Sequence, residues 1–226
     1  MSGNERVEIR VTIAAPVEEV WRALRDPAEI HRWFGWDYDG LEAEIQEIFV
    51  DGPHTVDEPR RIAWPTGDEF ELEARGRETV VRVTRPAPAD ADEWDEVYEG
   101  WTVYVQQLRF ALERHRGEDR RAVVLAGPED TPAVLGLDRL AALAPGERYE
   151  LDSPLGHLAG VLWYRSPHQV GVSVDAYGDG LIVAAGGESG KVLVTTYGLS
   201  DADHEQLRAR WLDLGRSLGL GAHPLG

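Results

Sequence analysis

Apolar residues occupy every second position of residues 5–14, which is the period of a β-strand with one buried face. The period then changes, because from Pro16 to Leu24 the apolar residues recur at helical spacing. A second short helix is expected from the cap residue Asp26 to Trp33. The start of the chain therefore predicts one strand followed by two helices.

Strand-like runs separated by turn residues follow between positions 41 and 85. In one of them Phe70 and Leu72 alternate with glutamates, which predicts an acidic, solvated outer sheet face. The Pro- and Ala-rich residues 85–92 are expected to form a linker. The predicted strands are 41–50, 60–64, 68–74 and 79–84.

Residues 92–115 carry a long apolar stripe at helical spacing and predict a helix of about 35 Å, at 1.5 Å per residue. Gly100 interrupts this helix and costs about 1 kcal/mol relative to Ala. The sequence leaves two explanations open, namely close approach of another group or a cost that good packing tolerates. Trp94, Trp101 and Tyr104 belong to the stripe.

The second half of the chain repeats the order of the first half. A strand at 121–126 and a helix at 129–144 precede several strands and a final helix that Ser200 caps, with a buried stripe that includes Trp211. We therefore expect a tandem structural repeat, with a first domain over 1–116 and a second, degenerate domain over 117–226. The strands predicted in this half are 147–151, 157–164, 168–176, 180–186 and 191–197.

A curved antiparallel sheet folded around one long helix leaves space between the two, because the concave face is wider than a helix. Such a space is typically apolar and takes a small apolar guest. Aromatic residues gather in "IHRWFGWDY" (30–38), where they could close one end of it. The candidate lining residues are Trp33, Trp36, Trp64, Phe70, Trp101, Tyr104, Val105 and Leu108.

Four separated motifs occur in an order that resembles the START/SRPBCC superfamily, in the branch of activators of a heat-shock chaperone ATPase. The resemblance implies an α+β, helix-grip fold with a hydrophobic ligand cavity, and it covers roughly residues 5 to 116. Relatives include lipid- or hormone-binding proteins, polyketide cyclases and chaperone activators. The motifs are "APVEEVWRALRDPAEIHRWF" (15–34), "EPRRIAW" (58–64), "ETVVRVT" (78–84) and "YEGWTVYVQQL" (98–108).

The amino-acid composition limits the classes of molecule that the chain is expected to bind. The 41 acidic residues outnumber the 23 basic ones, which gives a formal net charge of −18 and argues against nucleic-acid and anionic-membrane binding. Cysteine is absent, so a thiolate metal site or nucleophile is excluded. The chain has neither an apolar signal segment nor a run of roughly 18 apolar residues, which predicts a cytoplasmic protein. Lys191 is its single lysine, a composition typical of a GC-rich bacterium.

No recognisable catalytic set emerges, and the seven scattered histidines lack metal-binding spacing, so no metal or cofactor is expected. The sequence favours a non-catalytic binding or regulatory protein for a small hydrophobic molecule, with a protein partner as a further candidate. An enzyme of the polyketide cyclase type is an alternative, with His31, Tyr104 or Arg82 assisting proton transfer. A co-factor of a chaperone ATPase is a second alternative function.

Overall fold

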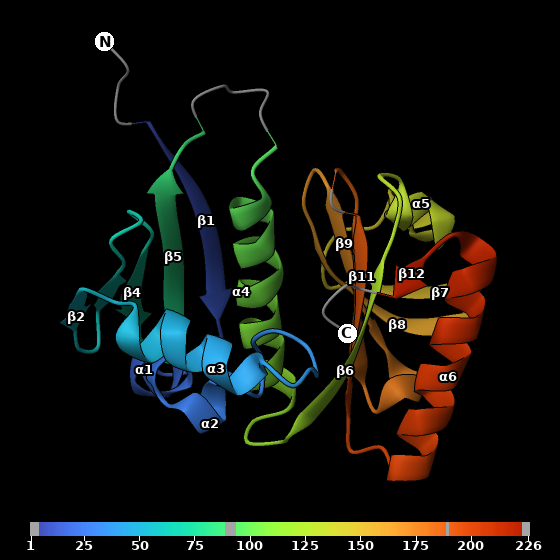
Figure 1. The fold of residues 1–226 in the computed structure, drawn as a ribbon, viewed down its shortest axis with the longest axis horizontal. Helices are drawn as coiled ribbons and strands as arrows, with labels where there is room; N and C mark the ends of the chain where they lie inside the picture. The colour runs from blue at the N-terminus through green and yellow to red at the C-terminus, as the bar shows by residue number, and fades with distance from the viewer. Residues whose placement is uncertain (1–4, 89–93, 189, 223–226) are drawn as a thin grey trace. The chain divides into compact units, whose positions relative to one another are not determined.

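The computed structural model describes residues 5–88, 94–188 and 190–222. The chain divides into two compact units, of which unit 1 comprises Met1–Gly35 and Asp39–Glu118, and unit 2 comprises Trp36–Tyr38 and Asp119–Gly226. Each unit is α+β, with an antiparallel sheet and a long helix near its C-terminal end (Figure 1). The predicted α+β fold class, with an antiparallel sheet and a long C-terminal helix, is thereby confirmed.

The sheet of unit 1 has the strand order β1-β5-β4-β3-β2 and is antiparallel throughout. Alternation along the first strand buries Ile9, Val11 and Ile13, while Glu8 and Arg10 stay exposed, as the period of two predicts. The strands are β1 (Arg6–Ile13), β2 (Thr55–Asp57), β3 (Arg61–Ala63), β4 (Glu69–Arg75) and β5 (Glu78–Pro86).

Side-chain caps set where the helices of unit 1 begin. Asp26 accepts a hydrogen bond from the Ala28 N–H at 3.0 Å, and Asp95 accepts one from the Tyr98 N–H at 2.9 Å. The long helix starts just after Asp95, whereas the sequence placed its start at 92; positions 89–93 of the linker and helix predictions lie outside the described residues. The helices are α1 (Val17–Arg25), α2 (Pro27–Ile30), α3 (Leu41–Ile45), the π-helix η1 (Gln46–Asp51) and α4 (Glu96–Arg114).

The predicted strand at 41–50 is wrong, because these residues form α3 and η1. Leu41, Ile45 and Phe49 are buried at a spacing of four residues, which is a helical period. Glu, Gln and Ala between them are good helix formers. The error came from reading a short apolar and acidic run as alternation, which is ambiguous at this length.

The sheet of unit 2 has the order β12-β6-β11-β10-β9-β8-β7. Its first strand pairs with its last long strand, as β1 pairs with β5 in unit 1. The strands are β6 (Arg120–Ala126), β7 (Arg148–Ser153), β8 (Gly156–Arg165), β9 (Gln169–Val174), β10 (Gly180–Ala185), β11 (Lys191–Tyr197) and β12 (Gly221–Ala222). The helices are α5 (Thr131–Val134), the 3-10 turns η2 (Leu137–Leu140) and η3 (Asp175–Tyr177), and α6 (Asp201–Leu218).

The continuous helix predicted over 129–144 is also wrong. The chain forms the single turn α5, then Gly136 at φ 73°, and then the 3-10 turn η2. A residue in the left-handed region cannot continue a right-handed helix, and glycine adopts this conformation at little cost. Leu137 and Leu140 nevertheless enter the core, so the apolar pattern was satisfied without a long helix.

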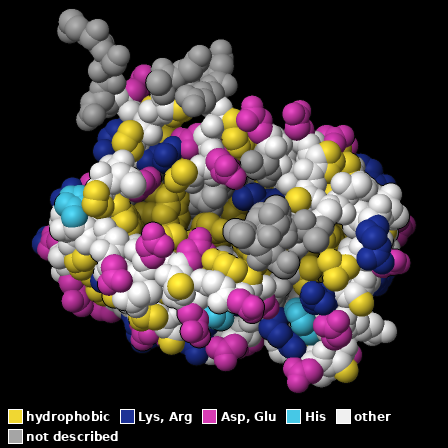
Figure 2. Space-filling model, viewed as in Figure 1, with side chains coloured by type: hydrophobic (Ala, Val, Ile, Leu, Met, Phe, Trp, Pro, Cys, Tyr) yellow, Lys and Arg dark blue, Asp and Glu magenta, His cyan; other side chains and the backbone are white. Residues whose placement is uncertain are grey.

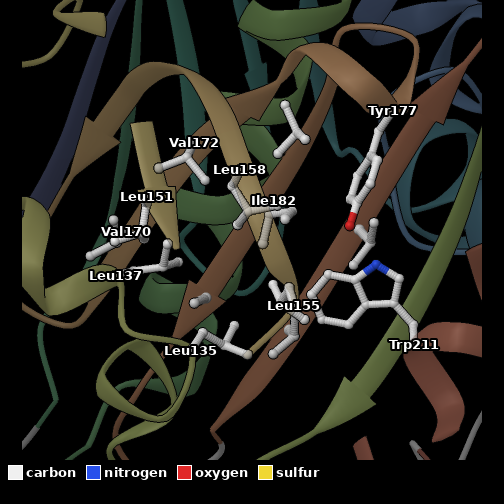
Figure 3. Packing of buried hydrophobic residues seen from close by; sticks show 14 of the residues in the cluster. Leu135, Leu137, Leu151, Leu155, Leu158, Val170, Val172, Tyr177, Ile182 and Trp211 are labelled. Atoms are coloured by element: carbon white, nitrogen blue, oxygen red, sulfur yellow. The ribbon is translucent and has the colours of Figure 1, made fainter. Parts of the chain in front are cut away.

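The core of unit 2 is built mostly from Leu, Val and Ile (Figure 3). From α6, Leu207 and Trp211 enter it, whereas Leu214 and Leu218 of the predicted stripe are only partly buried. Figure 3 shows the Tyr177 hydroxyl and the Trp211 ring nitrogen turned toward each other. Burial raises the pKa of Tyr177, so its hydroxyl stays protonated.

Candidate functional site

Seven aromatic side chains of unit 1, here called the ring cluster, contact one another between the sheet and α4. Trp101 of α4 lies at the centre, with ring centroids 5.0 Å from Phe70 of β4 and 6.1 Å from Trp64. Most of the pairs are edge-to-face, the arrangement that the ring quadrupole favours. The members are Trp33, Phe34, Phe49, Trp64, Phe70, Trp101 and Tyr104.

Local backbone groups hold two of these rings in place. The Trp33 indole N–H donates to the Ala23 carbonyl at 2.8 Å, and the Trp64 indole N–H donates to the Ile48 carbonyl at 2.6 Å. The Arg25 guanidinium donates to the carbonyl of Phe49. The π-helix η1 thus supplies both the Phe49 ring and two carbonyls that fix its surroundings, and π-helical turns are frequent at functional sites.

Burial divides the ring cluster into a closed and an accessible side. Trp33, Phe34, Phe49 and Phe70 are at most 2% exposed. Trp64 and Trp101 are 7% and 9% exposed. Tyr104 is only half-buried, although its ring centroid lies 4.5 Å from that of Phe34. Tyr104 is therefore the most accessible ring of the cluster, and an apolar molecule that reaches the cluster is expected to meet it first.

The space-filling view shows a hollow with hydrophobic side chains at its base (Figure 2). It lies over the region of unit 1 where Figure 1 draws β1, β5 and α4. In unit 1, α4 packs against β1 and carries Trp101 and Tyr104 of the ring cluster. A hollow with hydrophobic side chains at its base, on the unit that carries the ring cluster, is suited to hold a small apolar molecule.

The structure brings together five of the eight predicted lining residues as rings in mutual contact, namely Trp33, Trp64, Phe70, Trp101 and Tyr104. Val105 and Leu108 lie on the same helix and are fully buried. Trp36 is grouped with unit 2, and its ring lies 5.7 Å from that of Tyr38. Its place at this site stays a prediction.

Two members of the ring cluster were not among the predicted site residues. Phe34 stands next to Trp33 in the quoted aromatic stretch, and its proximity could have marked it. Phe49 fell in the segment that was predicted as a strand. The spacing of four between Leu41, Ile45 and Phe49 is the signal that would have placed it on the buried face of a helix.

A charged groove of about 580 Å³ lies at the N-terminal end of α4. Arg85 of β5 is paired with Asp68 at 3.2 Å and with Asp95, the cap of α4. All three side chains are less than one-fifth exposed. Pro86, Trp94 and Val97 are among the apolar residues that line the same groove, and Val97 is 47% exposed. This ion-pair set ties the start of α4 to the sheet.

Ion pairs cover the opposite, outer face of the unit 1 sheet. Arg82 pairs with Glu8 at 3.3 Å and with Glu71 at 3.2 Å. Arg61 makes two hydrogen bonds of 2.7 Å to the Glu69 carboxylate, and they lower the pKa of Glu69. This confirms the solvated acidic face that the alternation predicted, with arginines interleaved.

The structure does not assemble the three residues that the enzyme alternative named. Arg82 lies on the outer sheet face, opposite to the ring cluster that contains Tyr104. His31 is exposed at the end of α2. Within residues 5–88, 94–188 and 190–222, no group of three or more His, Asp or Glu side chains is placed to hold a metal ion. No helix of that described part is long and apolar enough to span a bilayer.

No protein-family model matches this chain, and no curated protein matches it. Solved structures do resemble it. DynU16, a protein in the dynemicin biosynthetic locus, is 19% identical over 96% of this chain and 98% of its own, with a TM-score of 0.38. CalU16 from Micromonospora echinospora is 23% identical over 49% of this chain and 66% of its own, with a TM-score of 0.36. The Aha1 dimer from Colwellia psychrerythraea is 19% identical over 50% of this chain and 99% of its own, with a TM-score of 0.38.

Solved structures thus include the kind of protein that the sequence motifs resemble. At these identities and TM-scores the likeness concerns the fold alone, and it carries nothing about what this chain binds or does.

Proposed function

We propose that unit 1 is a binding module that holds a small apolar molecule against the accessible side of the ring cluster, and that the chain acts by binding rather than by catalysis. The observation that carries the proposal is the position of Trp101, a residue of α4 whose ring contacts five other rings of unit 1. Flat, rigid rings give a guest a large contact area at little entropic cost.

The domain interpretation belongs to the same proposal. We infer that residues 1–116 form the helix-grip domain that binds the ligand, and that residues 117–226 form a degenerate copy. The shared strand order supports this, since in each unit the first strand pairs with the last long strand and the others follow in reverse sequence order. The aliphatic core of unit 2 supports assigning the ligand to unit 1.

The proposal is tested by titrating the uncharged fluorophore N-phenylnaphthylamine into the full chain. We expect saturable binding, with energy transfer from tryptophan to the bound probe. Trp101→Ala and Tyr104→Ala should each weaken binding by about tenfold or more, because losing one ring contact removes on the order of 1.4 kcal/mol. The control is Trp163→Phe in unit 2, which should leave the affinity unchanged.

Tyr104→Ala is the decisive variant, because Tyr104 is half-buried and its loss disturbs the core less than the loss of Trp101. Thermal melts identify any variant that has lost its fold. A wild-type chain that shows no saturable binding of the probe contradicts the proposal. So does a folded Tyr104→Ala variant with unchanged affinity.

A further inference from the structure

Strand β1 lies at one edge of the unit 1 sheet, and among the described residues β5 is its only strand neighbour. It is the longest of the four strands at the edges of the two sheets, with eight residues against three in β2, six in β7 and two in β12. Natural edge strands are commonly protected from further pairing by short length, a proline, a bulge or an inward-pointing charge. In β1 the register with β5 is regular from Arg6 to Ile13, and the inward residues are apolar. The edge of β1 is therefore unprotected.

Every second residue of β1 turns its backbone N–H and C=O toward this free edge. The Ala87 N–H donates to the Glu5 carbonyl at 2.9 Å, which marks the pair just before β1 as a hydrogen-bonded pair. Hydrogen-bonded and non-hydrogen-bonded pairs alternate along antiparallel strands, so the odd-numbered residues of β1 bond to β5 and the even-numbered residues face outward. The outward residues are Arg6, Glu8, Arg10 and Thr12, and all four are exposed.

A hydrogen bond just beyond β1 fits this alternation. The Ala14 N–H, which is the next even-numbered one, donates to the Glu113 carboxylate of α4 at 2.9 Å. Glu113 therefore closes the edge at Ala14. The open part of the edge runs from Arg6 to Thr12.

The charges on the open part complement a second copy of the same strand. Arg10 forms no ion pair within the described residues, and its charge acts on Glu73 only at longer range. Glu8 has a 45% exposed side chain and lies 3.3 Å from Arg82, which also pairs with Glu71 at 3.2 Å. One guanidinium thus serves two carboxylates. Two residues apart, β1 carries a carboxylate that is only partly neutralised and a cation that has no ion-pair partner.

Antiparallel pairing of two β1 strands, centred on Ile9, brings these charges together. Glu8 of each copy then lies opposite Arg10 of the other, and Arg6 lies opposite Thr12. Each of these pairs exchanges two backbone hydrogen bonds, and the Ile9 side chains of the two copies meet on the inner face. Centring the pairing on Glu8 or on Arg10 would instead set that charge against its own copy, which is unfavourable.

We infer that unit 1 pairs with a second copy of this chain through the free edge of β1, in an antiparallel register centred on Ile9, so that two five-stranded sheets join into one. Such a contact is two-fold symmetric, and each copy uses the same residues. The strand contains two arginines and one glutamate, a net charge of +1, in a chain with a net charge of −18. Repulsion between two acidic chains is therefore reduced at β1. This inference and the proposed ligand site do not depend on each other.

The test measures the mass of the full chain by sedimentation over a range of protein concentrations. We expect the wild type to move from the mass of one chain toward that of two as the concentration rises. Glu8→Arg and Arg10→Glu each place two like-charge pairs in the contact, so each should weaken the dimer by about tenfold or more. The double variant with both changes exchanges the charges and should restore it. Arg148→Glu, a charge reversal at the exposed edge strand β7, is the matched control and should change nothing.

Mixing the two single variants is the decisive measurement. The Glu8→Arg chain has arginine at both positions and the Arg10→Glu chain has glutamate at both, so only a dimer of one with the other is complementary. We expect the mixture to form this dimer, although each variant alone dimerises weakly. Thr12→Pro tests the backbone contribution, because it removes an outward N–H without changing a charge, and it should also weaken the dimer.

Amide exchange gives a residue-level readout. The N–H groups of Glu8, Arg10 and Thr12 should exchange more slowly in the dimer, whereas those of Ile9 and Val11 are protected at every concentration by β5. Thermal melts identify variants that have lost their fold. Arg10→Glu keeps the test usable if Glu8→Arg fails to fold, because Arg10 has no ion pair in the described residues to lose.

A wild type that remains a monomer at its highest soluble concentration overturns the inference. A folded Arg10→Glu variant that dimerises as tightly as the wild type does so too, because the contact then lies elsewhere. Two folded single variants that form no mixed dimer, or outward amides that exchange equally fast at all concentrations, would also overturn it.

Discussion

The two units share a strand order but fill their interiors with different chemistry. In unit 1, α4 meets the sheet through a cluster of seven rings, of which Tyr104 is half-buried and the others are buried. In unit 2, α6 meets a core made mostly of Leu, Val and Ile, with Tyr149, Tyr177 and Trp211 as its aromatic members, and Trp163, Tyr164 and Tyr197 are buried elsewhere in the unit. Backbone topology is therefore not what distinguishes a proposed ligand site from a solid core.

The difference follows from side-chain shape. Branched aliphatic side chains are small and interlock to the density of an organic crystal. Indole and phenol rings are flat and rigid, and they prefer to meet edge to face. The interior of unit 1 therefore offers a guest ring surfaces, whereas that of unit 2 offers mostly branched aliphatic side chains.

The largest expected effect tests whether unit 2 is a solid core. Trp211 is 1% exposed, so Trp211→Ala should destabilise unit 2 by about 3–5 kcal/mol through the cavity it leaves. Denaturant unfolding gives the loss, and hydrogen exchange assigns it to unit 2. Binding of the uncharged probe should not change. A small loss, below about 1 kcal/mol, would show that the unit 2 interior is not tightly packed.

A smaller effect tests how α4 is fixed in unit 1. Arg85→Ala leaves the mostly buried carboxylates of Asp68 and Asp95 without their cation, and we expect a loss of about 2 kcal/mol. The matched control is Arg75→Ala, whose pair with Glu73 is about half exposed and which should change stability much less than Arg85→Ala. Equal losses in the two variants would remove the special role of Arg85.

A buried histidine, His204, makes the stability of unit 2 depend on pH. His204 of α6 is buried, and its Nδ1 lies 3.1 Å from the Thr196 hydroxyl of β11. Burial and then the Arg121 charge lower its pKa below 6.5, against opposing contributions from Asp37 and Glu205.

The lowered pKa of His204 fixes the sign of its pH dependence. The unfolded chain binds the proton more readily than the folded one, so the stability of unit 2 is complete above pH 6.5 and falls as the pH drops below it. In His204→Gln this part of the pH dependence should disappear from unfolding curves collected between pH 7 and 5. His157→Gln, at an exposed histidine, serves as control. An unchanged pH profile in His204→Gln would contradict the assignment.

The smallest effect is stabilising. Gly100→Ala should raise the stability of unit 1 by up to about 1 kcal/mol, because alanine favours the helix and its methyl group meets no packed atom of the described residues. A melting curve measures the gain. Destabilisation would mean that packing requires a glycine at position 100, as it does at Gly171, where a Cβ would lie 2.3 Å from the Tyr164 ring.

Periodicity identified the long elements of both units. The alternation of residues 5–14 and the stripes that became α4 and α6 all formed the elements they predict, because each buries one face over many residues. It failed for 41–50 and 129–144, where the runs are short. In the first segment the chain forms the π-helix η1, and in the second Gly136 adopts a left-handed conformation that ends the helix.

The site was predicted in part for the same reason. Trp64, Trp101 and Tyr104 were marked by residue type and by their place on strands and helix stripes, and they do meet. Phe49 was missed because its ring direction depends on the π-helix.

The sequence by itself determined the fold class, the order of the long elements and the choice of rings for the interior of unit 1. These follow from local spacing and side-chain chemistry. Only the tertiary structure decided which rings meet, which of them keep an accessible edge and that the position beside Gly100 is open. The physical reason is that packing is a property of surfaces brought together from distant segments, and no local period records how completely they fill space.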